Sequence, residues 1–192
     1  MPLDCLHMTV LEAAHSQTEG EISRLVEMMR SKIPEITNHT YNHRARLIKP
    51  MLSYDAAAIA LSFLPAAGED IHDDRDPKAD GYTYHHLRRD IYALSKGTGV
   101  EIASRYVVPS SHLTIARFVT QQDFAIAGGG AMDKQKIANL VEKLVSINDG
   151  LQAKYWSEQT MDWQIGETKG LVCRRGTVWY GGGQSQHEGR GF

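Results

Sequence analysis

The chain has 192 residues, of which 42% are hydrophobic and 23% are charged. These values are typical of a soluble globular protein with one packed core, and they exclude a disordered chain. A net charge of -2 and a pI near 6.5 exclude a protein that coats long nucleic acid, because such proteins need clustered excess lysine and arginine. A small nucleotide or an RNA end remains compatible with this charge.

No apolar stretch approaches the roughly 20 residues that span a bilayer, and Met1–Asp4 lacks the basic and apolar regions of a signal peptide. We therefore expect a soluble intracellular protein, cytoplasmic or nuclear, without a membrane partner. Cys5 and Cys173 lie far apart and form no CxxC pair. This spacing predicts two reduced thiols rather than a disulfide framework or a zinc site.

The first half of the chain predicts a strand, a helix and then two further strands. Residues 4–14 have strand character. Thr18 and Glu21 have the spacing of a capping box, so a helix should begin there, and its apolar residues keep helical spacing up to Pro34, which should close it. We expect strands at 44–51 and 57–64. Residues 66–80 are rich in glycine, aspartate and proline, which predicts a solvated loop.

The second half predicts two more helices with a strand between them, followed by short strands. The helices show apolar residues at helical spacing, and glycine or asparagine residues mark their ends. The expected segments are helices at 84–94, ended by Gly97 and Gly99, and at 137–147, ended by Asn148–Gly150, strands at 105–119 and 163–180, and a frayed tail at 181–192.

A short motif, histidine and threonine separated by one apolar residue, occurs twice, as His7-Met-Thr9-Val and His112-Leu-Thr114-Ile. Successive side chains in a strand point to opposite faces, so each histidine shares a face with its threonine while the apolar neighbours take the other. Nine histidines predict roughly 0.2 such matches by chance. Each motif precedes a helical segment with the pattern I-x-x-L-V-E, which predicts two related lobes, although this pattern is also ordinary in amphipathic helices.

These residue types suit the opening of a cyclic phosphate. One histidine can activate water and the other can protonate the leaving oxygen, because an imidazole serves as base or acid near neutral pH. Threonine hydroxyls can donate hydrogen bonds to the non-bridging oxygens and support their charge without a metal. We therefore predict His7 and His112 as the acid/base pair, Thr9 and Thr114 as phosphate clamps, and no metal or other cofactor. Which histidine is the acid stays open.

The paired motifs resemble those of the 2H phosphoesterase superfamily, which includes LigT-like RNA ligases and cyclic nucleotide phosphodiesterases. The segment 6–16 looks most like a fungal branch of this superfamily. The resemblance implies an α+β fold with two lobes, antiparallel sheets that face a central cleft, and helices on the outside. It covers about residues 3–180, so we expect a single domain at 1–180 and a flexible tail at 181–192. It implies metal-independent hydrolysis of a 2′,3′-cyclic phosphate on a nucleoside or an RNA end.

The position of the first motif departs from the superfamily pattern. Members usually carry a strand and a helix before it, whereas His7 stands close to the start of this sequence. Without these elements, the lobe that carries His7 would expose an unpaired sheet edge or an apolar patch. We therefore expect either a homodimer formed through this lobe or a longer native chain.

Several other residues are candidates for substrate binding. Tyr82 and Tyr84 precede a helix with basic residues and could stack on a base, although a solvated helix start is the alternative. Trp179 and Tyr180 could line the cleft, although packing in the core is the commoner role of an aromatic residue. Arg117 has the parity opposite to the second motif, so its side chain should leave the cleft.

Alternative functions also follow from the residues. His72-Asp73-Asp74 could bind a metal, but no second cluster has ligand spacing, so we expect a solvated loop there. Within the 2H fold, a 2′-5′ RNA phosphodiesterase or ligase and a non-catalytic nucleotide-binding module stay open. The presence of two titratable histidines favours the enzyme, because a pure binder would not need them.

Overall fold

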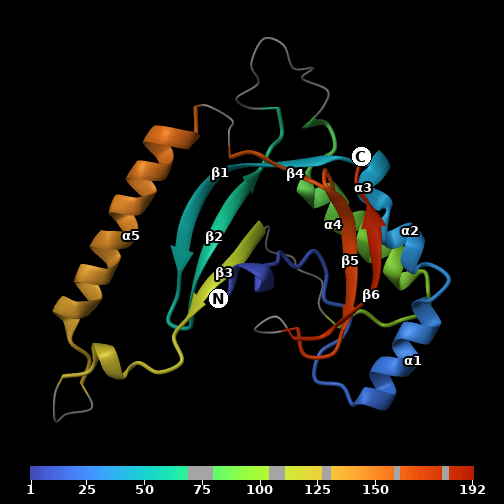
Figure 1. The fold of residues 1–192 in the computed structure, drawn as a ribbon, viewed down its shortest axis with the longest axis horizontal. Helices are drawn as coiled ribbons and strands as arrows, with labels where there is room; N and C mark the ends of the chain where they lie inside the picture. The colour runs from blue at the N-terminus through green and yellow to red at the C-terminus, as the bar shows by residue number, and fades with distance from the viewer. Residues whose placement is uncertain (69–79, 104–110, 127–130, 158–160, 179–181) are drawn as a thin grey trace.

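The computed structural model describes residues 1–68, 80–103, 111–126, 131–157, 161–178 and 182–192. Two antiparallel sheets and several helices make the fold α+β, as expected (Figure 1). Among these residues, no helix combines the length and the apolar character needed to cross a membrane. The elements are η1 (Leu3–Cys5), α1 (Glu19–Met29), α2 (Ile33–Thr37), α3 (His39–Asn42), β1 (Ala45–Tyr54), β2 (Ala58–Pro65), α4 (Tyr84–Lys96), β3 (Ser111–Arg117), η3 (Gln122–Phe124), α5 (Lys134–Tyr155), β4 (Trp163–Ile165), β5 (Lys169–Arg175) and β6 (Gln184–Arg190).

The larger sheet has the strand order β3-β2-β1-β4 and curls as it crosses the molecule (Figure 1). All three strand pairs are antiparallel. The register shifts between Ile48 and Met51 of β1, and again between Ile59 and Ala60 of β2 where it pairs with β3. Such shifts change which side chains share a face, because each extra residue on one strand reverses the alternation that follows it.

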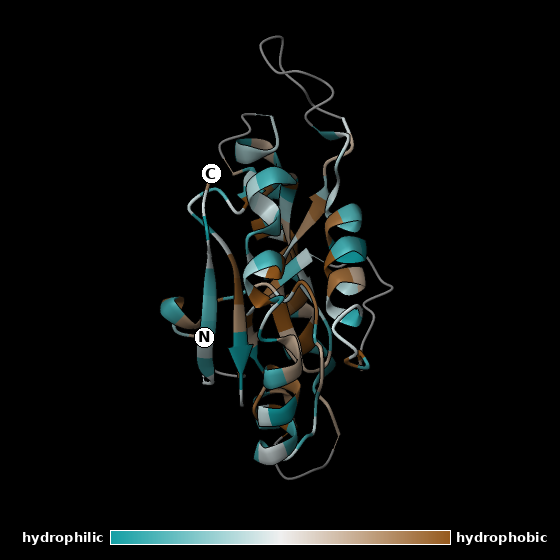
Figure 2. Ribbon diagram, turned by 90° about the vertical axis from the view of Figure 1, so that its right-hand side faces the viewer, coloured by the Kyte–Doolittle hydropathy of each residue, from teal (hydrophilic) through white to brown (hydrophobic). Residues whose placement is uncertain are grey.

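One face of this sheet is buried against α4 and α2. Apolar segments gather around the sheet, whereas the outer sides of the helices are mostly hydrophilic (Figure 2). Tyr84, Leu87 and Ile91 lie on one side of α4 and follow helical spacing, which is why this face of the helix is apolar. The buried cluster consists of Ile36, Ala45, Leu47, Phe63, Tyr84, Leu87, Ile91 and Ile165.

A buried ion network ties three segments of the chain together at one end of this sheet. The Arg46 side chain is 2% exposed, and its Nε and Nη2 donate to the two oxygens of Asp80 at 3.1 and 2.5 Å. Its Nη1 donates to Asp162, also at 2.5 Å. The hydrogen bonds that Arg46 donates to Asp80 raise the pKa of Arg46 and outweigh the opposing effect of burial. The network therefore joins β1 to the segments that precede α4 and β4.

The third predicted helix is longer than expected, because α5 continues through Asn148–Gly150 to Tyr155. Instead of ending the helix, Asn148 binds the edge of β1: its Oδ1 accepts from the Leu52 N–H at 2.6 Å, and its Nδ2 donates to the Leu52 carbonyl at 3.0 Å. Trp156 adds a third bond, from its Nε1 to the Pro50 carbonyl at 3.0 Å. The prediction of a stop was wrong, because these tertiary contacts outweigh a glycine cost of about 1 kcal/mol.

The end of the chain is also ordered differently from the expected tail. Residues 184–190 form β6, which pairs antiparallel with β5. A Cβ built on Gly189 would lie 2.0 Å from the Thr37 carbonyl oxygen, so only glycine allows α2 to approach this sheet so closely. Thr37 Oγ1 also lies 2.8 Å from Nδ1 of His187. The prediction of a flexible tail at 181–192 was therefore wrong. The apolar alternation that marks a strand is absent from this segment, and β6 is held by a glycine contact and by polar contacts instead.

The remaining predicted elements match in part. The capping box of Thr18 and Glu21 begins α1, and Gly97 ends α4, as predicted. The two strands expected at 44–51 and 57–64 correspond to β1 and β2. Pro34, expected to end the first helix, instead lies in the first turn of α2, where a proline costs no hydrogen bond.

We predict that Asp80→Asn destabilises the fold by about 3 kcal/mol, because it leaves the buried Arg46 charge with one carboxylate instead of two. Urea unfolding followed by circular dichroism measures this loss. The control is Glu27→Gln, which removes an exposed partner of Arg30 and should leave the unfolding midpoint unchanged. Equal effects of both substitutions would contradict a structural role for the network.

Replacement of Gly189 by alanine tests whether β6 is an integral part of the fold. The added methyl group would meet the backbone of Thr37, so Gly189→Ala should destabilise the protein by about 1–3 kcal/mol. The matched control is Gly20→Ala in α1, where an added Cβ meets nothing within 4 Å. Unfolding midpoints equal to those of the parent for both variants would mean that residues 184–190 do not pack as described.

Candidate functional site

The structure brings the two histidine–threonine motifs side by side. Met8 forms an isolated antiparallel bridge with Leu113 of β3, so the first motif lies along the edge of the strand that carries the second. Figure 1 shows the N-terminal segment beside β3. The strand predicted over residues 4–14 is only partly correct, because its beginning forms the short helix η1 and Met8 makes a single bridge rather than an extended ladder.

Strand alternation at this bridge places the histidines and threonines of the motifs away from the core. Met8 and Leu113 both pack against the buried cluster. Directly opposed residues of an antiparallel pair point to the same face, and their neighbours in sequence point to the other. The register therefore sets His7 opposite Thr114, and Thr9 opposite His112, on the face away from the core. We refer to this side of the β1–β4 sheet as the open face.

The hydrogen bond of His7 fixes which ring nitrogen carries its proton. Nδ1 of His7 lies 2.9 Å from the carbonyl oxygen of Cys5. A carbonyl can only accept, so Nδ1 must donate, and in the neutral ring Nε2 is then the nitrogen with a lone pair. A proton transfer by His7 would therefore use Nε2. The His7 side chain is partly buried.

The backbone on both sides of the first motif is anchored. The Met1 ammonium group donates to the Ile115 carbonyl of β3 at 2.8 Å. The hydroxyl of Tyr84 approaches the Thr9 carbonyl at 3.5 Å from the core side, which is a weak hydrogen bond at best. Thr9 itself is exposed, whereas His112 and Thr114 are partly buried. All four motif residues thus lie on a supported backbone with access to solvent.

The structure corrects the prediction for Tyr84 and separates Tyr82 from the motifs. Tyr84 is fully buried in the core, so it supports the site from behind and does not contact substrate. The Tyr82 hydroxyl donates to Asp90 at 2.9 Å and lies 3.0 Å from Nε2 of His39. Its ring stacks on His86. Burial, followed by the hydrogen bond to Asp90, raises the pKa of Tyr82. These partners belong to α3 and α4 and to neither motif.

Other predicted residues lie outside the described part of the chain. Trp179 and Tyr180, expected to line the cleft, belong to this group, and so does the His72–Asp74 triplet. Among the described residues, no three histidine, cysteine, aspartate or glutamate side chains are grouped so that they could hold a metal ion.

The thiol beside the first motif does not have the properties of a nucleophile. Desolvation, followed by the nearby Asp4 carboxylate, raises the pKa of Cys5. Burial raises the pKa of Cys173 in the same direction. A raised pKa keeps a thiol protonated, and the protonated form neither attacks phosphorus nor binds metal well. The imidazoles are therefore the better candidates for chemistry at this site.

Sequence reasoning missed two polar residues on the open face, Ser53 and Ser62, and placed a third, Arg117, on the wrong face. Ser62 of β2 lies directly opposite His112, and its Oγ lies 2.6 Å from Oγ of Ser53 on β1. Arg117 pairs with Ala58 because the register shifts within the β2–β3 pair. The shift returns Arg117 to the face of His112, so the prediction that its side chain leaves this face was wrong. A bulge of this kind leaves no clear signal in a single sequence.

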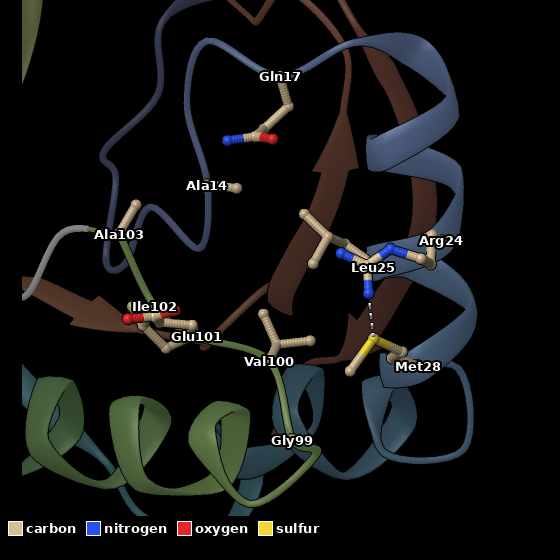
Figure 3. Close-up of a pocket in the computed structure, with 10 residues that line it drawn as sticks. All are labelled: Ala14, Gln17, Arg24, Leu25, Met28, Gly99, Val100, Glu101, Ile102 and Ala103. Carbon is tan, nitrogen blue, oxygen red and sulfur yellow. Dashed lines mark hydrogen bonds between the residues drawn. The ribbon is translucent and has the colours of Figure 1, made fainter.

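A separate pocket of about 510 Å³ lies between α1 and the segment that follows α4 (Figure 3). Apolar side chains and two charged residues, Arg24 and Glu101, line it, and none of its lining residues belongs to a motif. Arg24 donates to the sulfur of Met28 at 3.7 Å, as the dashed line in Figure 3 shows. The pocket therefore offers no motif side chain to a bound ligand.

Comparison of the chain with protein-family models, with curated proteins and with solved structures finds no match.

We predict that the neutral His7 ring is the Nδ1–H tautomer, because its Nδ1 donates to a carbonyl. Long-range proton–nitrogen correlation spectra at pH 9, assigned with His7→Gln, measure the two ring nitrogens separately. The exposed His85, for which no such hydrogen bond is seen in the described structure, is the internal control. An Nε2–H tautomer at His7 would contradict the proposed hydrogen bond to Cys5.

Proposed function

We propose that this chain is a metal-independent phosphodiesterase that opens a 2′,3′-cyclic phosphate on a nucleoside or an RNA end. The observation that carries the proposal is the Met8–Leu113 bridge, which aligns both histidine–threonine motifs on one face. A diagonal pair across such a bridge has its Cα atoms roughly 7–8 Å apart. Two imidazoles at this separation have room for a phosphate between their ring nitrogens.

The reaction requires one proton to be removed and one to be supplied. A water oxygen attacks phosphorus and loses its proton to the neutral histidine, while one ring P–O bond breaks. The charged histidine gives its proton to the departing ribose oxygen, and the product is a 2′- or 3′-phosphomonoester. Either His7 or His112 can fill either role. After turnover both protonation states are exchanged, and solvent restores them.

Threonine hydroxyls supply the electrostatic part of the mechanism. Thr9 and Thr114 lie on the same face as the histidines and can donate to the non-bridging oxygens as negative charge accumulates there. Such donors act without a metal ion, so the proposal requires none. The core-facing partners Met8 and Leu113 hold both motifs in register, and this reduces the reorganisation needed on substrate binding.

The proposal includes the finer fold and the cellular setting. The proposed fold is that of a 2H phosphoesterase, with the difference that both motifs lie on the β1–β4 sheet, whereas one motif in each lobe was expected. The protein would act in the cytoplasm or nucleus. A non-catalytic nucleotide-binding module is the second candidate. Its support is that the same hydroxyls and imidazoles could bind a phosphate without turnover. Hydrolysis assays decide between the two.

We expect His7→Ala and His112→Ala each to lower kcat by roughly 100-fold or more, because each removes a general acid or base. The double variant should be little slower than either single variant, since the two groups act as a unit. Hydrolysis of 2′,3′-cyclic AMP, CMP, GMP and UMP, followed by chromatography, measures these rates. His85→Ala, at an exposed position on α4, is the matched control and should retain the parental rate.

Circular dichroism and unfolding midpoints establish that the variants keep the fold. Near-parental activity in either single variant would contradict the paired-histidine mechanism. Binding of the nucleotides without any turnover by the parent protein would favour the binding module instead.

A further inference from the structure

Arg117 is the basic residue that the register shift of β3 returns to the open face. Thr114 pairs with Ala60, but Ala116 pairs with Ile59, so β3 contains one more residue than β2 at this point. Beyond the shift, Arg117 lies opposite Ala58, on the same side as Ala60 and Ser62. The face that carries both motifs therefore also carries a guanidinium group at one end.

Small side chains and one carboxylate surround Arg117 on the open face. Its neighbours on β2 on this face are Ala58 and Ala60, of which Ala60 is buried. The Asp55 carboxylate lies close enough for Arg117 to contribute to its lowered pKa, after the larger effect of hydrogen bonds from the N–H groups of Ala57 and Ala58. Asp55 is thus held mainly by the backbone of the β1–β2 turn.

Along β3, Arg117 lies about one nucleotide's length from Thr114 of the second motif. Arg117 follows Thr114 by three residues along β3, and one of the two residues between them belongs to the bulge, so their Cα atoms are separated by roughly 7–10 Å at about 3.3 Å per residue. An arginine side chain can cover part of this distance, and its fork of donors matches the oxygens of a phosphate. Ser53 and Ser62 add hydroxyl groups on the opposite flank of His112.

We propose that Arg117 forms a second phosphate subsite, which binds the phosphodiester one nucleotide away from the cyclic phosphate. The inference rests on the proposed function and narrows its substrate: RNA ends of at least two nucleotides bind at both positions, whereas a free cyclic nucleotide occupies only the motif site. Arg117 is then a specificity-determining residue and takes no part in proton transfer. The paired hydroxyls of Ser53 and Ser62 face the ribose side of the same ligand.

The test compares ApU ending in a 2′,3′-cyclic phosphate with 2′,3′-cyclic UMP. In the parent protein, kcat/KM for the dinucleotide should exceed that for the mononucleotide by about 10-fold or more. Arg117→Met should reduce this ratio by about 10-fold, and Arg117→Lys should restore part of it. The control is Arg30→Met, which removes an exposed arginine of comparable size that pairs with Glu27, and it should leave the ratio at the parental value.

Salt dependence provides a second readout that a structural defect would not imitate. Binding of one additional phosphate by a cation makes log(kcat/KM) fall more steeply with log salt, by roughly 0.7 for a single-stranded ligand. This extra slope should be present for the dinucleotide in the parent and absent in Arg117→Met. Equal kcat/KM values for both substrates, or a ratio unaffected by Arg117→Met, would overturn the second subsite while leaving the proposed hydrolysis intact. Hydrolysis of neither substrate would overturn the proposed function and the subsite with it.

Discussion

The sidedness of the β1–β4 sheet is the constraint on which the rest of the molecule depends. Side chains on one face of the sheet complete the core with α4 and α2. Successive residues of a strand point to opposite faces, so every second residue must point to the other side of the sheet. The apolar residues of both motifs, Met8 and Leu113, are held by the core. Their histidine and threonine neighbours therefore reach solvent on a backbone that has little freedom to move. This coupling of packing to exposure can preorganise a catalytic surface.

The supports of this sheet lie away from the proposed chemistry. The Arg46 network holds one end of β1, and Asn148 of α5 meets the backbone of Leu52 farther along the same strand. Burial of these polar groups is tolerated because each has partners of opposite charge or complementary hydrogen bonding. The partners described for these supports are Asp80, Asp162 and the Leu52 backbone, and none of these belongs to a motif. Changes to them should therefore affect stability first and catalysis only through loss of the fold.

Local patterns predicted much of the fold correctly. The capping box of Thr18, the apolar stripe of α4 and the alternation in β1 and β2 each require only a few neighbouring residues, so a single sequence contains the necessary information. Features set by distant contacts could not be predicted in this way. Asn148 resembles a helix stop in the sequence, and only its hydrogen bonds to Leu52 explain why the helix continues. The sequence of β6 has no apolar alternation, and its close contact with α2 at Gly189 becomes visible only in the structure.

The candidate site shows the same division. Strand alternation and the chemistry of imidazole identified His7, Thr9, His112 and Thr114 as one group, and the Met8–Leu113 bridge gives a physical reason for their proximity. The aromatic prediction failed at Tyr84 because burial depends on the packing of the whole core. The side of the sheet to which Arg117 points depends on a bulge in β3, and counting alternate residues along the sequence cannot reveal a bulge. For the candidate site, the structure therefore adds the register of the strands, which the sequence could not provide.

The central claim is that two imidazoles on the open face hydrolyse a cyclic phosphate without a metal ion. The most direct measurement is ³¹P NMR of a 2′,3′-cyclic nucleotide mixed with the parent protein after exhaustive treatment with EDTA. We predict that the cyclic phosphate signal is converted enzymatically to that of a single phosphomonoester, at the same rate with and without the chelator. Absence of conversion, or conversion that requires an added divalent metal, would contradict the account.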